Sequence, residues 1–375
     1  MSRFRAVKAD PLAGLKSSAG SLISLYAGRP SPGGFGALLS DLVKPVRLKS
    51  ESLDRAVQKS VRADGDRIQA LAPQLEEEFA PAYAVFASSL DDVFVVEPLT
   101  HLTPNVSVLG PRPYLRPLRA APRSLRSGVL VADRALARTF IGLAGIVDEI
   151  GPPLSADIGK ANYGGFSGYQ EHTVRARAEE ESTRMWREAG DRLLRAHQEE
   201  AFDYLAMGAH GEALDDIART LHPYLARLPR SVFVASPQEV TLPGLRESIN
   251  SLDAEVRRKR QSALAGRVCD TAWSGGNAVV GLTATLEAAN SGAIDTLVVA
   301  GRFSRPGVIC GHCGHLVRDG VTCPVCEHAM FEVDDVVAAV MESTVANGGT
   351  VHQIDVASAL DPRGIGAITR FTLVN

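Results

Sequence analysis

Long apolar runs are missing from this chain of 375 residues, and so is a strong excess of charge of either sign. No window approaches the roughly 20 apolar residues that a membrane-spanning helix needs. The apolar stretch at 22–26 is too short and too interrupted for a secretory signal peptide. We therefore expect a cytoplasmic protein without a membrane partner. A formal net charge of −3 gives no general attraction to DNA or RNA, so RNA binding would need local basic patches.

Cysteine is scarce as well, with five residues in the whole chain. Four of them form two Cys-x-x-Cys pairs, which do not make a disulfide framework in a chain of this length. The pattern fits a reducing compartment, in which thiolates stay available to bind metal. The fifth, Cys269, stands alone, and we expect it to be a small buried residue.

The paired cysteines are Cys310 with Cys313 and Cys323 with Cys326, and nine residues separate the pairs. Each Cys-x-x-Cys turn directs two sulfur atoms toward one point, so two turns complete a tetrahedral shell of four sulfurs. Thiolate ligands favour zinc over hard cations. We predict one structural Zn²⁺ in a zinc ribbon at 308–328, because a filled shell leaves no position for a catalytic water. Three nearby histidines are expected at the surface or just outside the ligand shell: His312, His315 and His328.

Chain length and the order of apolar segments predict an α/β protein of three mixed α/β domains, the third with the ribbon inserted between a strand and a helix. The first domain, 1–125, has strand-like runs at 21–28, 82–88 and 92–99 and a helical pattern at about 51–75. The middle domain, 126–243, has strands at 128–133, 137–150 and 231–236 and helices at about 171–200 and 211–226. The third domain, 244–375, has helices at about 277–290 and 333–345 and strands at 295–301, 350–355 and 366–373.

An arginine-rich segment at 98–132 contains no acidic residue. Four prolines within 111–122 exclude a regular helix there. Two interpretations stay open, a solvated connector between domains and a strip that contacts phosphates through guanidinium groups. The arginines concerned are Arg112, Arg116, Arg119, Arg123 and Arg126.

A polar, glycine-rich loop precedes the long charged helix of the middle domain. It is not a P-loop, because it lacks the Lys-Ser/Thr pair, and it is not a dinucleotide-binding Gly-x-Gly-x-x-Gly turn. One interpretation is a flexible loop ahead of a helix. The other is an RNA contact, in which glycines allow close approach, aromatic rings stack on bases and arginines meet phosphates. The residues of this candidate site are Tyr163, Gly164, Gly165, Phe166, Ser167, Gly168, Tyr169, Gln170, Arg175 and Arg177.

The order of these parts resembles the archaeo-eukaryotic release factor and Pelota superfamily. The resemblance rests on SLISLYAG and AYAVFAS in the first domain, on the Gly-Gly loop before a charged helix, and on GGNAVVGLTATLEAANSGAIDTLVVAG (275–301) and GIGAITRF (364–371) in the third. It covers nearly the whole chain, is weakest before residue 80, and is nearest to the bacterial, Balon-like branch. The cysteine ribbon in the third domain is similar to that of archaeal release factors.

The resemblance implies a ribosome-binding translation factor, with the middle domain at the peptidyl-transferase centre and the third domain near translational GTPases. In the release factors of this superfamily a Gly-Gly-Gln loop helps water to attack peptidyl-tRNA. Here Phe166 follows Gly164-Gly165, and Gln170 lies four positions further on. We therefore expect no catalytic residue, and a non-hydrolytic factor that occupies the A-site region in ribosome hibernation or rescue. Its expected partners are ribosomal RNA, with tRNA and a translational GTPase as further candidates.

Two alternatives remain open. One is a rescue enzyme that cleaves peptidyl-tRNA or tRNA, with Gln170 or Ser167 positioning the water. The other is a zinc-ribbon adapter that binds a protein partner away from ribosomes.

Overall fold

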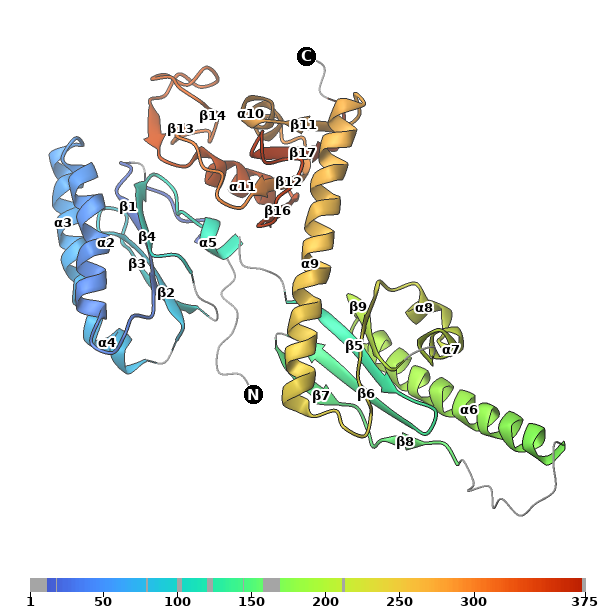
Figure 1. Ribbon diagram of the computed structural model, residues 1–375. Helices are drawn as coiled ribbons and strands as arrows, with labels where there is room; N and C mark the ends of the chain where they lie inside the picture. Colours follow the sequence, from blue (N-terminus) through green and yellow to red (C-terminus); the bar gives the residue numbers. More distant parts are fainter. Residues whose placement is uncertain are drawn as a thin grey trace. The chain divides into compact units, whose positions relative to one another are not determined.

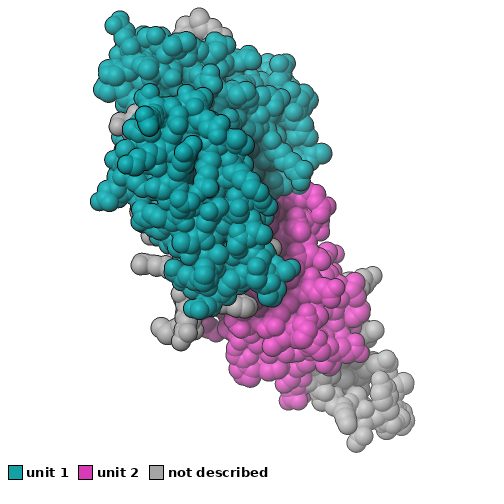
Figure 2. Space-filling model, turned by 90° about the vertical axis from the view of Figure 1, so that its left-hand side faces the viewer, with its two compact units in different colours: residues 1–121, 261–375 teal, residues 122–260 magenta. Residues whose placement is uncertain are grey.

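The computed structural model describes residues 12–372 apart from 18, 79, 100–102, 120–123, 144, 158–168 and 211–212. By its contacts the chain divides into two compact units, one of residues 1–121 with 261–375 and one of residues 122–260 (Figures 1 and 2). The fold is mixed α/β, as predicted. Because the N-terminal and C-terminal sheets share unit 1, the division into three domains stays a prediction.

The N-terminal sheet of unit 1 is antiparallel, with strand order β3-β2-β1-β4. Its strands are β1 (Leu22–Gly28), β2 (Ala82–Ser88), β3 (Val93–Leu99) and β4 (Val106–Gly110). Every residue of β2 is buried, which is why its apolar run does not alternate with polar residues. The predicted strands at 21–28, 82–88 and 92–99 are confirmed.

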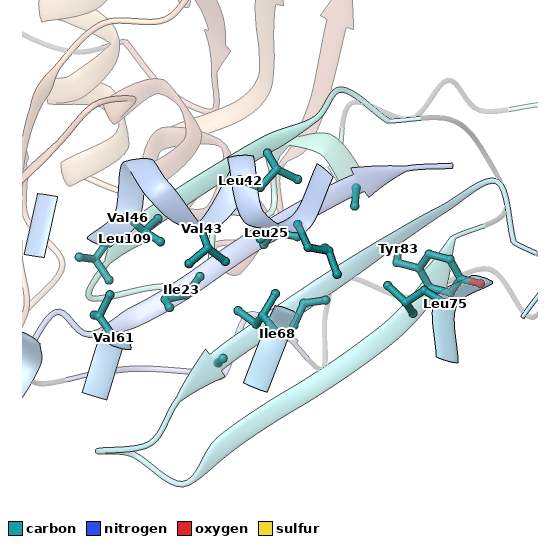
Figure 3. Packing of buried hydrophobic residues seen from close by; sticks show 14 of the residues in the cluster. Ile23, Leu25, Leu42, Val43, Val46, Val61, Ile68, Leu75, Tyr83 and Leu109 are labelled. Carbon is teal, nitrogen blue, oxygen red and sulfur yellow. The ribbon is translucent and has the colours of Figure 1, made fainter. Parts of the chain in front are cut away.

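Three helices accompany this sheet: α2 (Phe35–Ser50), α3 (Arg55–Gln69) and α4 (Ala72–Glu77). Figure 3 shows Leu42 and Val43 of α2 beside Ile23 and Leu25 of β1 in one buried cluster. The helix predicted at about 51–75 is wrong in extent, because α3 ends at Gln69, and α2 was not predicted.

The α2–α3 contact depends on a glycine in α3. A Cβ built on Gly65 would lie 2.7 Å from Cγ1 of Val43. The two helices can approach this closely because Gly65 has no side chain.

Unit 2 contains a sheet with strand order β10-β9-β5-β6-β7, and β8 also pairs with β6. The strands are β5 (Arg126–Ala132), β6 (Leu136–Leu143), β7 (Ile146–Glu149), β8 (Leu154–Ser155), β9 (Tyr204–Gly208) and β10 (Arg230–Phe233). The predicted strand at 137–150 is two strands, β6 and β7, because the chain turns at Gly145, whose φ is +79°. The fully buried β9 was not predicted.

Helices pack on both faces of this sheet (Figure 1). One face carries α6 (Tyr169–Glu199), α7 (Ala213–Thr220) and α8 (Pro223–Ala226). The other face packs against the first part of α9 (Leu242–Trp273), whose Leu245, Ile249 and Leu252 are buried there. Trp186 of α6 is buried in the core on this face, and its Nε1–H donates to the Asp133 carbonyl oxygen at 2.8 Å.

The C-terminal sheet of unit 1 has strand order β11-β17-β12-β16. Its elements are β11 (Ala278–Val280), α10 (Leu282–Asn290), β12 (Ile294–Ala300), α11 (Val336–Ala346), β16 (Thr350–Ile354) and β17 (Ile365–Thr369). The helix predicted at 277–290 begins only at Leu282, because β11 and Gly281 with φ +89° precede it. Cys269 of α9 is buried, as predicted.

The cysteine segment forms a separate small sheet of order β14-β13-β15. Its strands are β13 (Gly307–Cys310), β14 (Leu316–Val317) and β15 (Met330–Val333). They lie between β12 and α11 in the chain, so the ribbon is an insertion into the C-terminal α/β part, as predicted.

The arginine-rich segment is not a solvated connector. It contains β4 and the short helix α5 (Arg116–Arg119), and Nη1 of buried Arg116 donates to Oδ2 of Asp335 at 2.7 Å. Arg119 contacts both carboxylate oxygens of Glu342, at 3.1 and 3.2 Å. In unit 2, Arg126 pairs with Glu200. Three of the five arginines proposed to contact phosphate are thus bound to carboxylates of the same chain.

Within the described residues we find no helix that combines the length and apolar character needed to cross a bilayer.

Candidate metal centre and glycine-rich loop

Two turns of equal construction hold the four paired cysteines. In each turn the N–H of the first cysteine donates to a histidine carbonyl five residues later, from Cys310 to His315 and from Cys323 to His328, both at 2.9 Å. The carbonyl oxygen of each first cysteine in turn accepts a hydrogen bond from the residue four positions on, Gly314 or Glu327. These two residues have left-handed backbones, with φ of 79° and 60°. The sequence therefore folds twice into the same turn, a candidate metal-binding turn.

The four sulfur atoms converge within 4.8 Å of one another. Sγ of Cys326 lies 3.4 Å from those of Cys310 and Cys313, and Sγ of Cys313 lies 3.5 Å from that of Cys323. These distances are too long for a disulfide, whose S–S bond is about 2.05 Å. They are near the ~3.8 Å between sulfurs that tetrahedral Zn–S bonds of about 2.3 Å would give. The donor set thus fits one metal ion of the zinc type.

The backbone of each turn favours the thiolate at its first cysteine, Cys310 or Cys323, whereas the pKa of the second, Cys313 or Cys326, is raised. Burial opposes ionisation of Cys310, but hydrogen bonds from the Cys313 N–H, at 3.4 Å, and from the neighbouring thiols outweigh it and lower the pKa of Cys310 to about 6. At Cys323 burial again opposes ionisation, and the Val325 N–H, at 3.5 Å, contributes to a lowered pKa. Because metals bind the thiolate, the same amide groups prepare both sulfurs for a metal ion.

The histidines beside the cluster do not complete an alternative shell. His312 and His328 are both exposed, and their rings stack with centroids 4.1 Å apart and planes at 6°. Although their nitrogens lie near Cys326 Sγ, the lone pairs of parallel rings run side by side and do not converge on one ion. These two histidines lie at the surface, as predicted.

The ribbon is anchored on the hydrophobic core of the C-terminal part of unit 1, which contains the C-terminal sheet, α10 and α11. Ile309 and Leu316 are buried in its hydrophobic cluster. The side-chain amide of Asn290, at the end of α10, accepts from the N–H of Leu316 at 2.8 Å and donates to its carbonyl oxygen at 2.7 Å. Both the closed donor set and this anchoring suit a structural metal.

The glycine-rich loop connects β8 to α6, and its residues 158–168 lie outside the described part of the chain. Helix α6 begins at Tyr169, so Gln170 has a helical backbone. The side chains of residues 169–175, among them that of Arg175, are also outside the description. Arg177 is exposed on α6. The predicted RNA contact through this loop therefore stays a prediction.

A pocket that the sequence did not indicate lies between α6 and α7. It has a volume of about 400 Å³. Its charged lining mixes both signs and consists of Arg134, Glu179, Arg187, Asp216 and Arg219. Asp216 and Arg219 form an ion pair at 2.8 Å. This balance of charge favours no ligand class.

The known proteins to which this chain is similar include a peptide chain release factor and Pelota proteins. No family model matches the chain. The sequence is 24% identical over 359 residues to peptide chain release factor subunit 1 of Methanocaldococcus jannaschii, covering 86% of this chain and 84% of that protein. Similar solved structures include an archaeal translation termination factor (15% identity, TM-score 0.26, 96% of both chains) and the Pelota chain in a model of ribosome-bound archaeal Pelota and ABCE1 (14%, 0.42, 78% of both). Both TM-scores lie below 0.5, so the whole chains superpose poorly.

Proposed function

We propose that this chain is a ribosome-binding translation factor of the archaeo-eukaryotic release factor and Pelota superfamily. One observation carries the proposal: the similarity to a peptide chain release factor extends over 86% of the chain. A likeness confined to the cysteine ribbon would have favoured an adapter. We further assign the chain to the bacterial, Balon-like branch, from the segments 275–301 and 364–371.

The factor does not hydrolyse peptidyl-tRNA. Phe166 follows Gly164-Gly165, where hydrolytic members of the superfamily carry glutamine. Gln170 cannot substitute for it at the tip of the loop, because its backbone belongs to the first turn of α6. A factor that binds without cleaving suits ribosome hibernation or rescue.

The loop contacts ribosomal RNA in the A-site region. Tyr163, Phe166 and Tyr169 supply rings that stack on unpaired bases, a contact worth about 1–3 kcal/mol per base. Arg177, exposed on α6, and Arg175 supply charges for phosphates. The protein acts in the cytoplasm with the ribosome, and tRNA and a translational GTPase are its further candidate partners.

One Zn²⁺ bound by the four paired cysteines has a structural role. When bound, it closes the ribbon by fixing both turns to one point, and it leaves no open position for a reacting water.

Co-sedimentation of the purified full chain with vacant bacterial ribosomes across a salt series tests the proposal. Saturable binding that weakens with salt is expected, because phosphate contacts release counterions. Arg177→Ala should weaken binding and reduce its dependence on salt. Arg195→Ala is the matched control, because Arg195 is also exposed on α6 but about 27 Å further along the helix.

A peptide-release assay on stalled ribosome complexes separates the two kinds of ribosomal factor. We expect no release above background. Release that Gln170→Ala abolishes would identify a hydrolase instead. Absence of binding to vacant, stalled and tRNA-loaded ribosomes would reject both and favour the zinc-ribbon adapter.

A further inference from the structure

The cysteine ribbon, here the small sheet β13–β15 of residues 307–333, contacts the N-terminal part of unit 1 (residues 12–121) through Phe331. The β13–β15 ladder places Phe331 opposite Ile309, next to the first ligand Cys310. A Cβ on Gly20 would lie 3.2 Å from Cε1 of Phe331, and a Cβ on Gly311, inside the first metal-binding turn, would lie 2.6 Å from Cε2. The ring of Phe331 thus packs between a glycine of the N-terminal part and a glycine of the metal-binding turn.

Arg112 makes a second contact with the same turn. A Cβ on Gly314, the residue after Cys313, would lie 3.2 Å from Nη2 of Arg112. Nε of Arg112 is buried and has no hydrogen-bond partner among the described residues. A guanidinium group in this position places a positive charge against the metal-binding turn.

Two aspartates directly after β15 add further contacts with the N-terminal part. Oδ2 of Asp334 accepts from Nζ of Lys49 in α2 at 2.6 Å. Oδ2 of Asp335 accepts from Arg116 at 2.7 Å and from the Tyr114 hydroxyl at 3.1 Å. If β15 moved, Asp334 and Asp335 would move with it, and Lys49, Tyr114 and Arg116 would lose their hydrogen bonds to these carboxylates.

We propose that the metal-loaded ribbon holds the N-terminal sheet against the C-terminal part of unit 1, with Arg112 and Phe331 as the links. Four thiolates around one divalent ion leave two net negative charges, which the guanidinium of Arg112 partly neutralises. The ion fixes the first turn, and that turn together with the β13–β15 ladder fixes Phe331 and the two aspartates. Loss of metal loosens the ribbon and weakens this docking, whereas the contacts of Arg119 with Glu342 and of Arg116 with Gly301, which lie outside the ribbon, remain.

The coupling has a reciprocal consequence. If metal binding favours docking of the N-terminal part, docking raises the affinity for metal by the same factor. A substitution in the N-terminal part that touches no cysteine must then weaken metal binding. Arg112→Ala is such a substitution, and we expect zinc affinity to fall on the order of tenfold, as for outer contacts of other metal sites.

The experiment measures zinc affinity of the full chain by competition with a chelator, for wild type, Arg112→Ala and Arg318→Ala. Arg318 is the matched control, because it is an exposed arginine on the ribbon itself. Amide hydrogen exchange of residues 111–119 is measured in parallel on wild-type protein before and after zinc removal. Strand β9 of unit 2 serves as the internal reference, and exchange of wild-type protein keeps the test valid if Arg112→Ala fails to fold.

The inference predicts weaker zinc binding in Arg112→Ala only, and faster exchange of 111–119 after zinc removal with β9 unchanged. Equal zinc affinity in all three proteins would overturn it, as would exchange that speeds up in the ribbon but not in 111–119. A wild-type chain that binds no zinc would reject the metal assignment and the inference together, while leaving the ribosome-binding proposal untouched.

Discussion

Arg116 and Asp335 form a nearly buried ion pair between segments that are 219 residues apart in the sequence, with Nη1 and Oδ2 separated by 2.7 Å. Their side chains are only 8% and 10% exposed. Arg116 also donates to the carbonyl oxygen of Gly301 at 3.2 Å, whereas Oδ1 of Asp335 is buried without a partner among the described residues. Loss of either side chain would therefore leave a charge with little access to water.

Arg116→Ala should lower the free energy of unfolding by about 3 kcal/mol, because it leaves the buried carboxylate of Asp335 without its ion-pair partner. Urea denaturation of the full chain measures this. Replacing both residues by apolar ones of similar size should cost much less. The control is Arg219→Ala, which removes the exposed pair with Asp216 (75% and 42% exposed) and should change stability by about 1 kcal/mol or less. Equal effects of the two alanine variants would contradict the account.

Cys323→Ser should abolish zinc binding and locally unfold the ribbon, because structural zinc binding is coupled to folding. Elemental analysis of the purified protein should find one zinc per wild-type chain and none in this variant. Cys269→Ala should keep its zinc, since Cys269 is buried in another part of the structure. Unchanged zinc content in Cys323→Ser would disprove the four-thiolate site.

Substitution of the residue with a left-handed backbone should lower the stability of the first metal-binding turn but not that of the second. Gly314→Ala should cost about 1 kcal/mol, because an L side chain is strained at φ +79°. Glu327→Gly should be neutral or stabilising, since glycine relieves the strain at φ +60°. Thermal unfolding of the zinc-loaded proteins reports both effects. If Glu327→Gly destabilises the protein as much as Gly314→Ala does, backbone strain at these two positions does not determine the stability of the turns.

Asp253 gives unit 2 a predictable pH dependence. Burial raises the pKa of Asp253 above its ordinary value, although the hydrogen bond from the Tyr204 hydroxyl, at 2.6 Å, opposes this. The folded state thus holds this proton more tightly than the unfolded chain, so the carboxyl contributes stability below about pH 4 that is lost as the pH rises through its raised pKa.

Asp253→Asn removes the titration and keeps an oxygen that accepts from Tyr204. The variant should therefore gain stability relative to wild type as the pH rises from about 4. Denaturant midpoints of both proteins measured over this range provide the comparison. A constant difference between the two proteins would rule out the raised pKa.

Local signals in the sequence predicted the parts of the fold that depend on neighbouring residues. The buried run of β2 and the two Cys-x-x-Cys turns were found because their patterns are short and complete. Helix α2 was missed because it follows a Pro-Gly turn and contains Pro45, both of which argue against a helix in sequence. The ion pairs of Arg116 and Arg119 could not be predicted, because their partners, Asp335 and Glu342, lie more than 200 residues away and no local pattern links them.

Competition with tRNA shows whether the protein occupies the A-site region of the ribosome, as we propose. Labelled full-length protein is titrated into vacant ribosomes, ribosomes with P-site tRNA alone, and ribosomes with tRNA in both the P and A sites. We expect similar binding to the first two and strongly reduced binding when the A site is filled. Equal affinity for all three would show that the protein binds elsewhere on the ribosome and would reject A-site occupancy.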